Sequence, residues 1–466
     1  FLPELTKGQE VLLSFEGVNL TSDVYINGKR AGGYVGGYLG FDVNITDYVR
    51  YDQENEIYIR VDNSVNPTIV PSQKADFFIY GGITRDVFLK LVPAVSISDM
   101  DVNISKVSKS SARTEVVLSV DNTGKRRSDQ INIQVKDSAG KTVLSYKKKK
   151  TIKAGSNDIK ISLSKLKNPH LWSPDDPHLY TVTAKIGESG DWLTDKIGYR
   201  WFEFEEHGPF KLNGERMLLK GTHRHEEWAG YGNAMPNSLH IKDMQMIKDV
   251  GANFVRLAHY PQDPAVYAAC DSLGLLVWDE VPWCRGGVGP VDWQNNTMNM
   301  LEDMIDQNRN HPSVILWSMG NEVYWMPDFE GGGEIDEIRN FMIKMHLRAK
   351  ELDPSRMTST RKFYEGADIV DVFSPSIWAG WYGGYYKNFE KAIAKSRKDY
   401  SRFFHMEYGG SSHVGRHNET PITGSGTIDP EGWEEDENQV QVKNVARTSN
   451  WDENYIVDLF DWHLNV

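Results

Sequence analysis

Cysteine is nearly absent from the sequence, which has only Cys270 and Cys284 among its 466 residues. Neither belongs to a Cys-x-x-Cys pair or to a mixed Cys and His spacing, so we expect neither a disulfide scaffold nor a structural zinc site. Long apolar runs are missing too. Residues 314–317 form one of the longest, whereas a membrane-spanning helix needs roughly 20 apolar residues. We therefore expect no membrane span.

Positive charge is scarce relative to negative charge, with 52 Lys and Arg against 65 Asp and Glu and a net charge of −13. A negative total repels nucleic-acid phosphates and anionic membrane surfaces, so we expect no nucleic-acid partner. Residues 1–4 have neither the basic nor the apolar region of an export signal. The compartment and a homo-oligomeric state stay open, and we favour the periplasm or secretion over the cytoplasm.

Two strand-rich segments occupy the first part of the chain. Residues 11–92 contain short alternating runs, such as Glu-Ile-Tyr-Ile-Arg-Val at 56–61, separated by turn signals such as Asn27-Gly28. Residues 96–204 repeat this pattern over the roughly 100 residues of an immunoglobulin-like sandwich. We predict a β-sandwich over 1–94, truncated at its amino end, and an immunoglobulin-like β-sandwich over 95–204.

From residue 205 onward, short apolar strands alternate with helical stretches. This rhythm predicts a parallel sheet, and a (β/α)8 barrel has eight such strands. A helical stretch at 455–464 comes last, where an eighth strand is expected next, so we predict a TIM-barrel domain over 205–466 that is truncated at its carboxyl end. The seven candidate strands are 216–220, 253–257, 275–278, 314–317, 357–359, 369–373 and 402–405.

Two glutamates directly follow barrel strands. Glu322 follows the fourth strand and Glu407 follows the seventh, about three βα units of roughly 31 residues apart. Since barrel active sites lie at the carboxyl ends of the strands, we expect both carboxylates to face one cavity. A protonated and an ionised carboxylate opposite each other are suited to cleavage of a glycosidic bond.

Other polar and aromatic residues also follow the predicted strands. Sugars bind through directional polar contacts and flat aromatic faces, so this mixture suits a pyranose ring better than a phosphate or an apolar ligand. These residues are His223, Arg224, His225, His259, Tyr260, Asp279, Glu280, Trp378 and Trp381.

A series of motifs resembles glycoside hydrolase family 2, the family of β-galactosidases, β-glucuronidases and β-mannosidases, over essentially the whole chain. The resemblance implies a jelly-roll sugar-binding sandwich, an immunoglobulin-like sandwich and a (β/α)8 barrel, in that order. The motifs are Gly81–Val87, Leu171–Pro174, Lys220–His225, Arg256–Pro261, Trp278–Glu280, His311–Glu322 and Glu407–Gly409.

The resemblance implies specific catalytic roles. Glu322 would be the general acid/base, Glu407 the nucleophile, and Asn321 the partner of the sugar 2-hydroxyl. The reaction would form a covalent glycosyl-enzyme and retain the anomeric configuration, which requires carboxyl groups about 5–5.5 Å apart. His225 and His259 match positions that hold the sugar ring, and Asp76 matches a carboxylate that reaches into the pocket from the first sandwich.

The sequence departs from the family pattern at two places. Residues 281–286 lack the Glu and His that metal-dependent β-galactosidases place after the third strand, so we expect no cofactor and no active-site magnesium. Trp378 stands where the family commonly has a Tyr near the nucleophile. We expect Trp378 to contact the substrate, and the hydrogen bond that a Tyr would donate to Glu407 to be either missing or supplied by another residue.

We expect an exo-acting enzyme that releases terminal β-linked galactose from oligosaccharides or polysaccharide fragments. His225, His259 and Asp76 suit a neutral hexose, and no Asn-x-Lys tripeptide, which a β-glucuronidase would use to bind the sugar carboxylate, follows Glu407. The alternatives are a β-glucuronidase, a β-mannosidase or a catalytically inactive carbohydrate-binding protein. The glycine-rich loop at 409–417 would either shape a subsite or be an ordinary loop.

Overall fold

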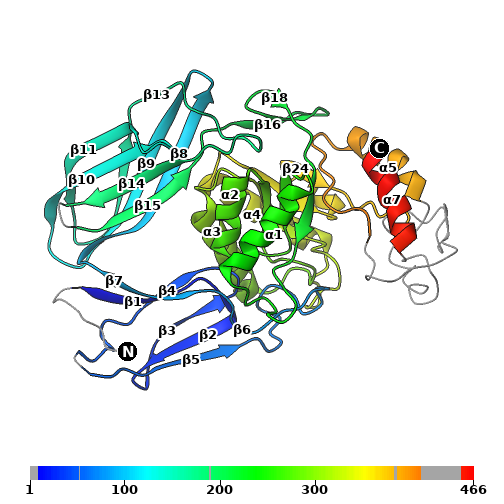
Figure 1. Cartoon of the computed structure of the whole chain (residues 1–466). Coiled ribbons are helices and arrows are strands. Elements are labelled where there is room, and N and C mark those ends of the chain that lie inside the picture. Colours follow the sequence, from blue (N-terminus) through cyan, green and yellow to red (C-terminus); the bar gives the residue numbers. More distant parts are fainter. Residues whose placement is uncertain (1–8, 52, 188–189, 382–385, 411–452) are drawn as a thin grey trace. The chain divides into compact units, whose positions relative to one another are not determined.

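The structure is a computed structural model that describes residues 9–51, 53–187, 190–381, 386–410 and 453–466. The chain divides into two units. The first comprises Phe1–Glu203 and Phe210–Thr358, and the second comprises Phe204–Pro209 and Ser359–Val466. Figure 1 shows the helices and strands and labels many of them.

The first sandwich has one antiparallel sheet of order β4-β1-β7 and another of order β3-β2-β5, with β6 beside β2. Strand side chains alternate between two faces, and the inward residues Leu13, Val24 and Ile26 are at most 4% exposed. The bounds are β1 (Glu10–Phe15), β2 (Val18–Ile26), β3 (Lys29–Gly36), β4 (Phe41–Asn44), β5 (Ile57–Asp62), β6 (Gly82–Ile83) and β7 (Val87–Val92).

The second sandwich packs a β11-β10-β14-β15 sheet on a sheet formed by β12, β9, β13 and β8. Alternate residues of β9 and β10, among them Val116, Leu118, Ile131 and Ile133, are fully buried. The predicted order of two sandwiches is confirmed. The bounds are β8 (Val95–Ser108), β9 (Ser111–Asn122), β10 (Arg127–Lys136), β11 (Thr142–Ile152), β12 (Gly155–Ser162), β13 (Leu166–Lys167), β14 (Tyr180–Ile186) and β15 (Trp192–Ile197).

Parallel strands and helices follow, as in a (β/α)8 barrel. In the first unit β19 pairs with β20, β20 with β21 and β21 with β22, all in parallel. Helix α2 packs on β21, and α3 and α4 pack on β22. The bounds are β19 (Gly221–Arg224), α1 (Asn237–Asp249), β20 (Phe254–Leu257), α2 (Pro264–Leu273), β21 (Leu276–Glu280), α3 (Val291–Asn308), β22 (Val314–Asn321) and α4 (Ile335–Leu352). Within the described ranges, no helix combines the length and apolarity needed to cross a membrane.

The first barrel strand begins later than the sequence predicted. Residues 216–220 were expected as this strand, but it is Gly221–Arg224. Instead, β17 (Phe210–Leu212) and β18 (Glu215–Arg216), which follow β16 (Phe202–Phe204), form an antiparallel hairpin. Its turn is Asn213-Gly214, where both residues have positive φ, as the tightest hairpin turns require. The turn places residue 216 in this hairpin, and residues 217–220 connect the hairpin to the barrel.

The second unit contains a parallel pair formed by residues 359–361 of β23 (Met357–Arg361) and β24 (Val372–Ser374). The predicted strand at 402–405 is only an isolated parallel bridge between Phe373 and Phe403. The predicted last helix is confirmed as α7 (Glu453–Asn465), whose His463 ring stacks 4.0 Å from that of Phe389 in α5. The other elements of this unit are η1 (Tyr364–Gly366), η2 (Tyr386–Asn388) and α5 (Phe389–Asp399).

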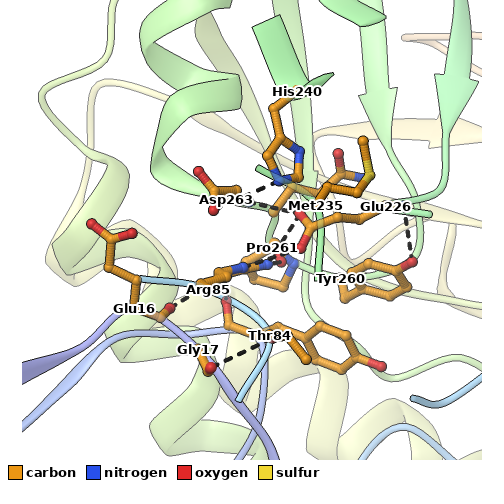
Figure 2. A network of polar contacts seen from close by, with 12 residues as sticks. Glu16, Gly17, Thr84, Arg85, Glu226, Met235, His240, Tyr260, Pro261 and Asp263 are labelled. Carbon is orange, nitrogen blue, oxygen red and sulfur yellow. Dashed lines mark hydrogen bonds and ion pairs between the residues drawn. The ribbon is translucent and has the colours of Figure 1, made fainter. Parts of the chain in front are cut away.

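A buried ion pair joins the first sandwich to the barrel within the first unit (Figure 2). The Arg85 Nε lies 3.1 Å from Oε1 of Glu226, and each side chain is 1% exposed. Arg85 also donates to the carbonyl of Pro261 at 2.7 Å, and Glu226 accepts a hydrogen bond from the Asp263 amide at 2.7 Å. Because buried charges must be paired, this contact fixes the loop that carries Arg85 against the carboxyl ends of β19 and β20.

Candidate active site

Asn321 and Glu322 lie at the carboxyl end of β22, a strand in which every residue is buried. Asn321 is 2% exposed and Glu322 is 6% exposed. The chain turns sharply here: Gly320 has φ 145° and Glu322 has φ 51°. A Cβ on Gly320 would lie 2.6 Å from the carbonyl oxygen of Trp283, so the turn requires glycine at that position. It thereby aims the Glu322 side chain away from the strand.

Arg285 is the cation that contacts Glu322. Its Nε donates to Oε2 of Glu322 at 2.8 Å, and its Nη2 donates to Oδ2 of Asp76 at 2.7 Å. The predicted site residues Glu322 and Asp76, which belong to different modules, therefore share one guanidinium. Asp76 remains 60% exposed, whereas the Glu322 side chain is 8% exposed.

Asn321 is held by a buried network that leads to His259. Arg256 Nη2 donates to Oδ1 of Asn321 at 3.1 Å and to the Glu280 carboxylate at 2.9 Å. Burial raises the pKa of Glu280, but Arg256 and His259 outweigh burial and lower it to about 2. The His259 Nδ1 lies 2.7 Å from Oε1 of Glu280. With Nδ1 donating to this carboxylate, a neutral His259 ring offers Nε2 as an acceptor.

His225 and His259 lie together, with ring centres 5.4 Å apart. The Phe77 ring, from the same loop as Asp76, lies 5.2 Å from His225 and 5.7 Å from His259. The Tyr260 hydroxyl lies 3.4 Å from His225 Nδ1 and accepts from the Glu226 amide at 3.1 Å. The first unit thus brings five predicted residues to one edge of the sheet: Asp76, His225, His259, Asn321 and Glu322.

The second unit contains the remaining predicted residues, Glu407 and Trp378. Glu407 is 8% exposed, and its Oε2 lies 2.9 Å from Nη2 of Arg361, the last residue of β23. Arg361 thus supplies a hydrogen-bond donor to Glu407. An adjacent guanidinium favours the ionised carboxylate, which is the form a nucleophile needs. Trp378 is half-buried and packs against Trp381 and α7.

The surroundings of Glu322 do not suit a divalent cation. Magnesium prefers oxygen ligands in octahedral geometry, whereas the Arg285 guanidinium already lies at hydrogen-bond distance from this carboxylate. The neighbouring Cys284 thiol is buried and accepts from Asn321 Nδ2 at 3.5 Å. Burial raises the pKa of this thiol well above its ordinary value, so it remains protonated and is a poor metal ligand.

Three carboxylates elsewhere in the first unit come close together. Within the described residues, oxygens of Asp99, Asp101 and Asp306 lie within 4.8 Å of one another. Arg309 pairs with Asp101 at 2.6 Å, which offsets part of the repulsion. Burial and the neighbouring carboxylates raise the pKa of Asp99 to about 6.

Sequence reasoning missed the arginines that hold the site residues. Arg256, Arg285 and Arg361 each contact a predicted site residue. A signal was available for two of them, because a charged residue within an otherwise buried strand must find a partner, and Arg256 and Arg361 lie within β20 and β23. Of the loop predicted at 409–417, residues from 411 onward lie outside the described part of the chain.

Comparison with known families assigns the three modules. The description "Glycosyl hydrolases family 2, sugar binding domain" matches residues 1–93. "Glycosyl hydrolases family 2" matches residues 95–200, and "Glycosyl hydrolases family 2, TIM barrel domain" matches residues 203–422. These matches follow the order of the two sandwiches and the barrel.

Several relatives carry enzyme names. A protein of Formosa agariphila named "Putative beta-glucuronidase" is 53% identical over 97% of this chain and 55% of its own length. A "Beta-galactosidase" of Thermoanaerobacter pseudethanolicus is 33% identical over 80% of this chain and 49% of its own length. The crystal structure of Parabacteroides merdae beta-glucuronidase matches with a TM-score of 0.91 and 36% identity, over 99% of this chain and 60% of its own. The chain thus spans about half the length of the curated relatives. Its modules and motifs place it in glycosyl hydrolase family 2, to which it belongs.

Proposed function

We propose that this chain is the catalytic part of a retaining β-glycosidase that releases terminal glucuronic acid. The observation that carries the chemistry is the placement of Glu322 and Glu407. Each is almost fully buried, follows a barrel strand or bridge, and pairs with an arginine. Ionisable groups of this kind at the carboxyl ends of barrel strands are typical of catalytic residues.

The proposed reaction has two steps. Glu407, ionised beside Arg361, attacks the anomeric carbon while Glu322 protonates the departing glycosidic oxygen. The resulting glycosyl ester on Glu407 is then hydrolysed by a water that the ionised Glu322 deprotonates, with net retention. Asn321, oriented by Arg256, donates to the sugar 2-hydroxyl, and His225 and His259 bind the ring.

Glucuronide is supported as the substrate by the names of similar proteins. The relative at 53% identity and the structure at TM-score 0.91 are both named as β-glucuronidases, whereas the β-galactosidase reported above is 33% identical. The sequence-based expectation of galactose release is therefore the second candidate. Asp76, whose side chain is 60% exposed, favours this second candidate. Its carboxylate can accept hydrogen bonds from the hydroxyl groups of galactose, whereas it would repel the carboxylate of glucuronic acid.

Parallel assays test this proposal. The protein, its Glu322→Gln variant and its Glu407→Gln variant are assayed on 4-nitrophenyl β-D-glucuronide, β-D-galactoside and β-D-mannoside. We expect cleavage of the glucuronide, loss of essentially all turnover in Glu407→Gln, and a loss of about 10²–10⁴-fold in Glu322→Gln. NMR of the first-formed sugar should show the β-anomer. Cleavage of the galactoside alone would favour the second candidate, and the α-anomer would exclude the retaining mechanism.

A further inference from the structure

Arg285 connects the acid/base side to a loop of the first sandwich. Besides its bonds to Glu322 and Asp76, its Nη1 donates to the carbonyl of Lys74 at 3.2 Å. Its guanidinium carbon lies 4.5 Å from the centre of the Trp325 ring, a distance at which cation–π attraction is significant. A positive charge is thus fixed at hydrogen-bond distance from the proposed acid/base.

The backbone that presents this ion pair is unusual at both ends. Arg285 has φ 61° and Glu322 has φ 51°, although few residues other than glycine adopt positive φ. The Arg285 amide donates to the Asn321 carbonyl at 3.0 Å, which ties the loop after β21 to the end of β22. Such conformations are retained where the surrounding structure enforces them, and they are common at functional sites.

The two carboxylate contacts of Arg285 differ in exposure. The Glu322 side chain is 8% exposed, whereas that of Asp76 is 60% exposed. An exposed ion pair contributes little stability because water competes for both charges. The bond from Arg285 to Asp76 can therefore be exchanged for another anion at small cost, while Glu322, Lys74 and Trp325 continue to hold the guanidinium in place.

The exchange keeps the charge around Glu322 balanced. Glu322 must carry a proton in the first step, and a guanidinium at 2.8 Å favours its ionised form. Asp76, the second anion on the guanidinium, weakens this effect, and a substrate carboxylate that replaces Asp76 takes over the same role.

We propose that Arg285 is a specificity-determining residue that binds an anionic group of the substrate, the carboxylate of a terminal uronic acid, in exchange for Asp76. The proposal rests on the proposed glucuronidase function and names the residue that recognises its acidic sugar. The planar fork of an arginine fits a carboxylate through two parallel hydrogen bonds. Asp76 keeps the guanidinium oriented until the substrate arrives.

Matched substrates test this role. 4-Nitrophenyl β-D-glucuronide and β-D-glucoside differ only at C6, where one has a carboxylate and the other a hydroxymethyl group. We expect Arg285→Gln to lower kcat/KM for the glucuronide by about 10- to 100-fold, mainly through KM, and to change that for the glucoside by less than about threefold. Equal losses on both substrates would show a structural role and overturn the proposal.

Two further variants sharpen the test. Asp76→Asn should lower KM for the glucuronide, because the substrate carboxylate no longer competes with Asp76; a higher KM would overturn the exchange. Arg309→Gln is the control, since Arg309 pairs with a carboxylate at 2.6 Å and is 13% exposed, against 12% for Arg285. Arg309→Gln should leave the ratio of kcat/KM for the glucuronide to kcat/KM for the glucoside unchanged.

Failure of the glucuronidase proposal can be told apart from failure of the Arg285 proposal. If the protein cleaves galactosides and not glucuronides, the proposed function is wrong, and Arg285 is tested on the matched β-D-galacturonide and β-D-galactoside. If the ratio of kcat/KM for the galacturonide to that for the galactoside is unchanged in Arg285→Gln, the anion-binding role is overturned. A lowered ratio supports it. A loss confined to glycosides with a carboxylate on the leaving group would overturn the assignment of Arg285 to the terminal uronic acid.

Discussion

Arg85 and Glu226 form a two-point ion pair between the first sandwich and the barrel, with distances of 3.1 and 3.3 Å and side chains that are each 1% exposed. Glu226 directly follows His225, and its amide donates to the Tyr260 hydroxyl at 3.1 Å. The ion pair therefore also helps to position His225, one of the residues predicted to bind the sugar. Arg85 belongs to the motif 81–87, so this contact gives that motif a structural role.

Removing one partner of this pair should be costly. We expect Arg85→Met to lower the free energy of unfolding by about 3–5 kcal/mol, because Glu226 would be left buried and unpaired. The double variant Arg85→Met/Glu226→Met should recover much of the loss. Thermal unfolding of the single and double variants in a double-mutant cycle measures both effects.

An exposed ion pair provides the matched control for this experiment. Lys109 lies 3.1 Å from Glu215, with side chains 72% and 78% exposed, so Lys109→Met should leave the unfolding temperature almost unchanged. If Arg85→Met leaves the unfolding temperature as little changed as Lys109→Met does, the buried pair does not anchor the sandwich.

Glu16, which lies beside the same network (Figure 2), should make stability depend on pH. Burial, followed by Asp263 and Asp86, raises its pKa from 4.5 to about 7. Below pH 4.5 the carboxyl is protonated in both states, and between 4.5 and 7 only the folded state keeps the proton. Stability should therefore fall as pH rises through this window. Unfolding temperatures at pH 5 and 8 should differ less in Glu16→Gln than in the wild type.

The control for this prediction is Glu56→Gln, which changes an exposed carboxylate of the same sandwich. It should preserve the pH dependence of the wild type. A Glu16→Gln variant with an unaltered pH dependence would show that Glu16 titrates alike in the folded and unfolded states.

Arg361 should control the form of the proposed nucleophile. Its Nη2 lies 2.9 Å from Oε2 of Glu407, so Arg361→Gln removes the charge that favours ionised Glu407. We expect kcat/KM to fall and the acidic limb of its pH profile to move to higher pH. Arg361→Lys, which keeps the charge, should shift the limb less. An unchanged profile in Arg361→Gln, with lower stability only, would assign Arg361 a purely structural role.

The order of the modules and the place of Glu322 directly after a barrel strand could be predicted from the sequence because each depends on local pattern. Alternating apolar residues mark the sandwiches, and an apolar run that ends in Gly320-Asn321-Glu322 marks a strand and its polar end. The apolar run at 216–220 does not locate the first barrel strand, because the Asn213-Gly214 turn pairs residue 216 with β17 in a hairpin. Helix α2 (Pro264–Leu273) has local signals at its start, since the Asp263 side chain caps it and Pro264 begins it.

The ion pairs of the site could not be predicted in the same way, because their partners are distant in the sequence. Arg285 and Asp76 are 209 residues apart, and Arg256 and Asn321 are 65 residues apart. No local spacing relates such residues, and only the parallel sheet and the docked sandwich bring them together. Trp378 was predicted from its place after a strand, but that placement does not reveal its packing against α7. Its contact with substrate stays a prediction.

Both cysteine thiols should resist modification in the folded protein. Cys270 and Cys284 are buried, and burial raises the pKa of each thiol well above its ordinary value. Since the thiolate is the reactive form, we expect iodoacetamide to leave both unmodified under native conditions and to alkylate both after denaturation in guanidinium chloride. Mass spectrometry of the two peptides measures this. Native alkylation of Cys284 alone would mean that the loop between β21 and α3 opens while the chain stays folded, and the guanidinium of Arg285 would then not be rigidly held.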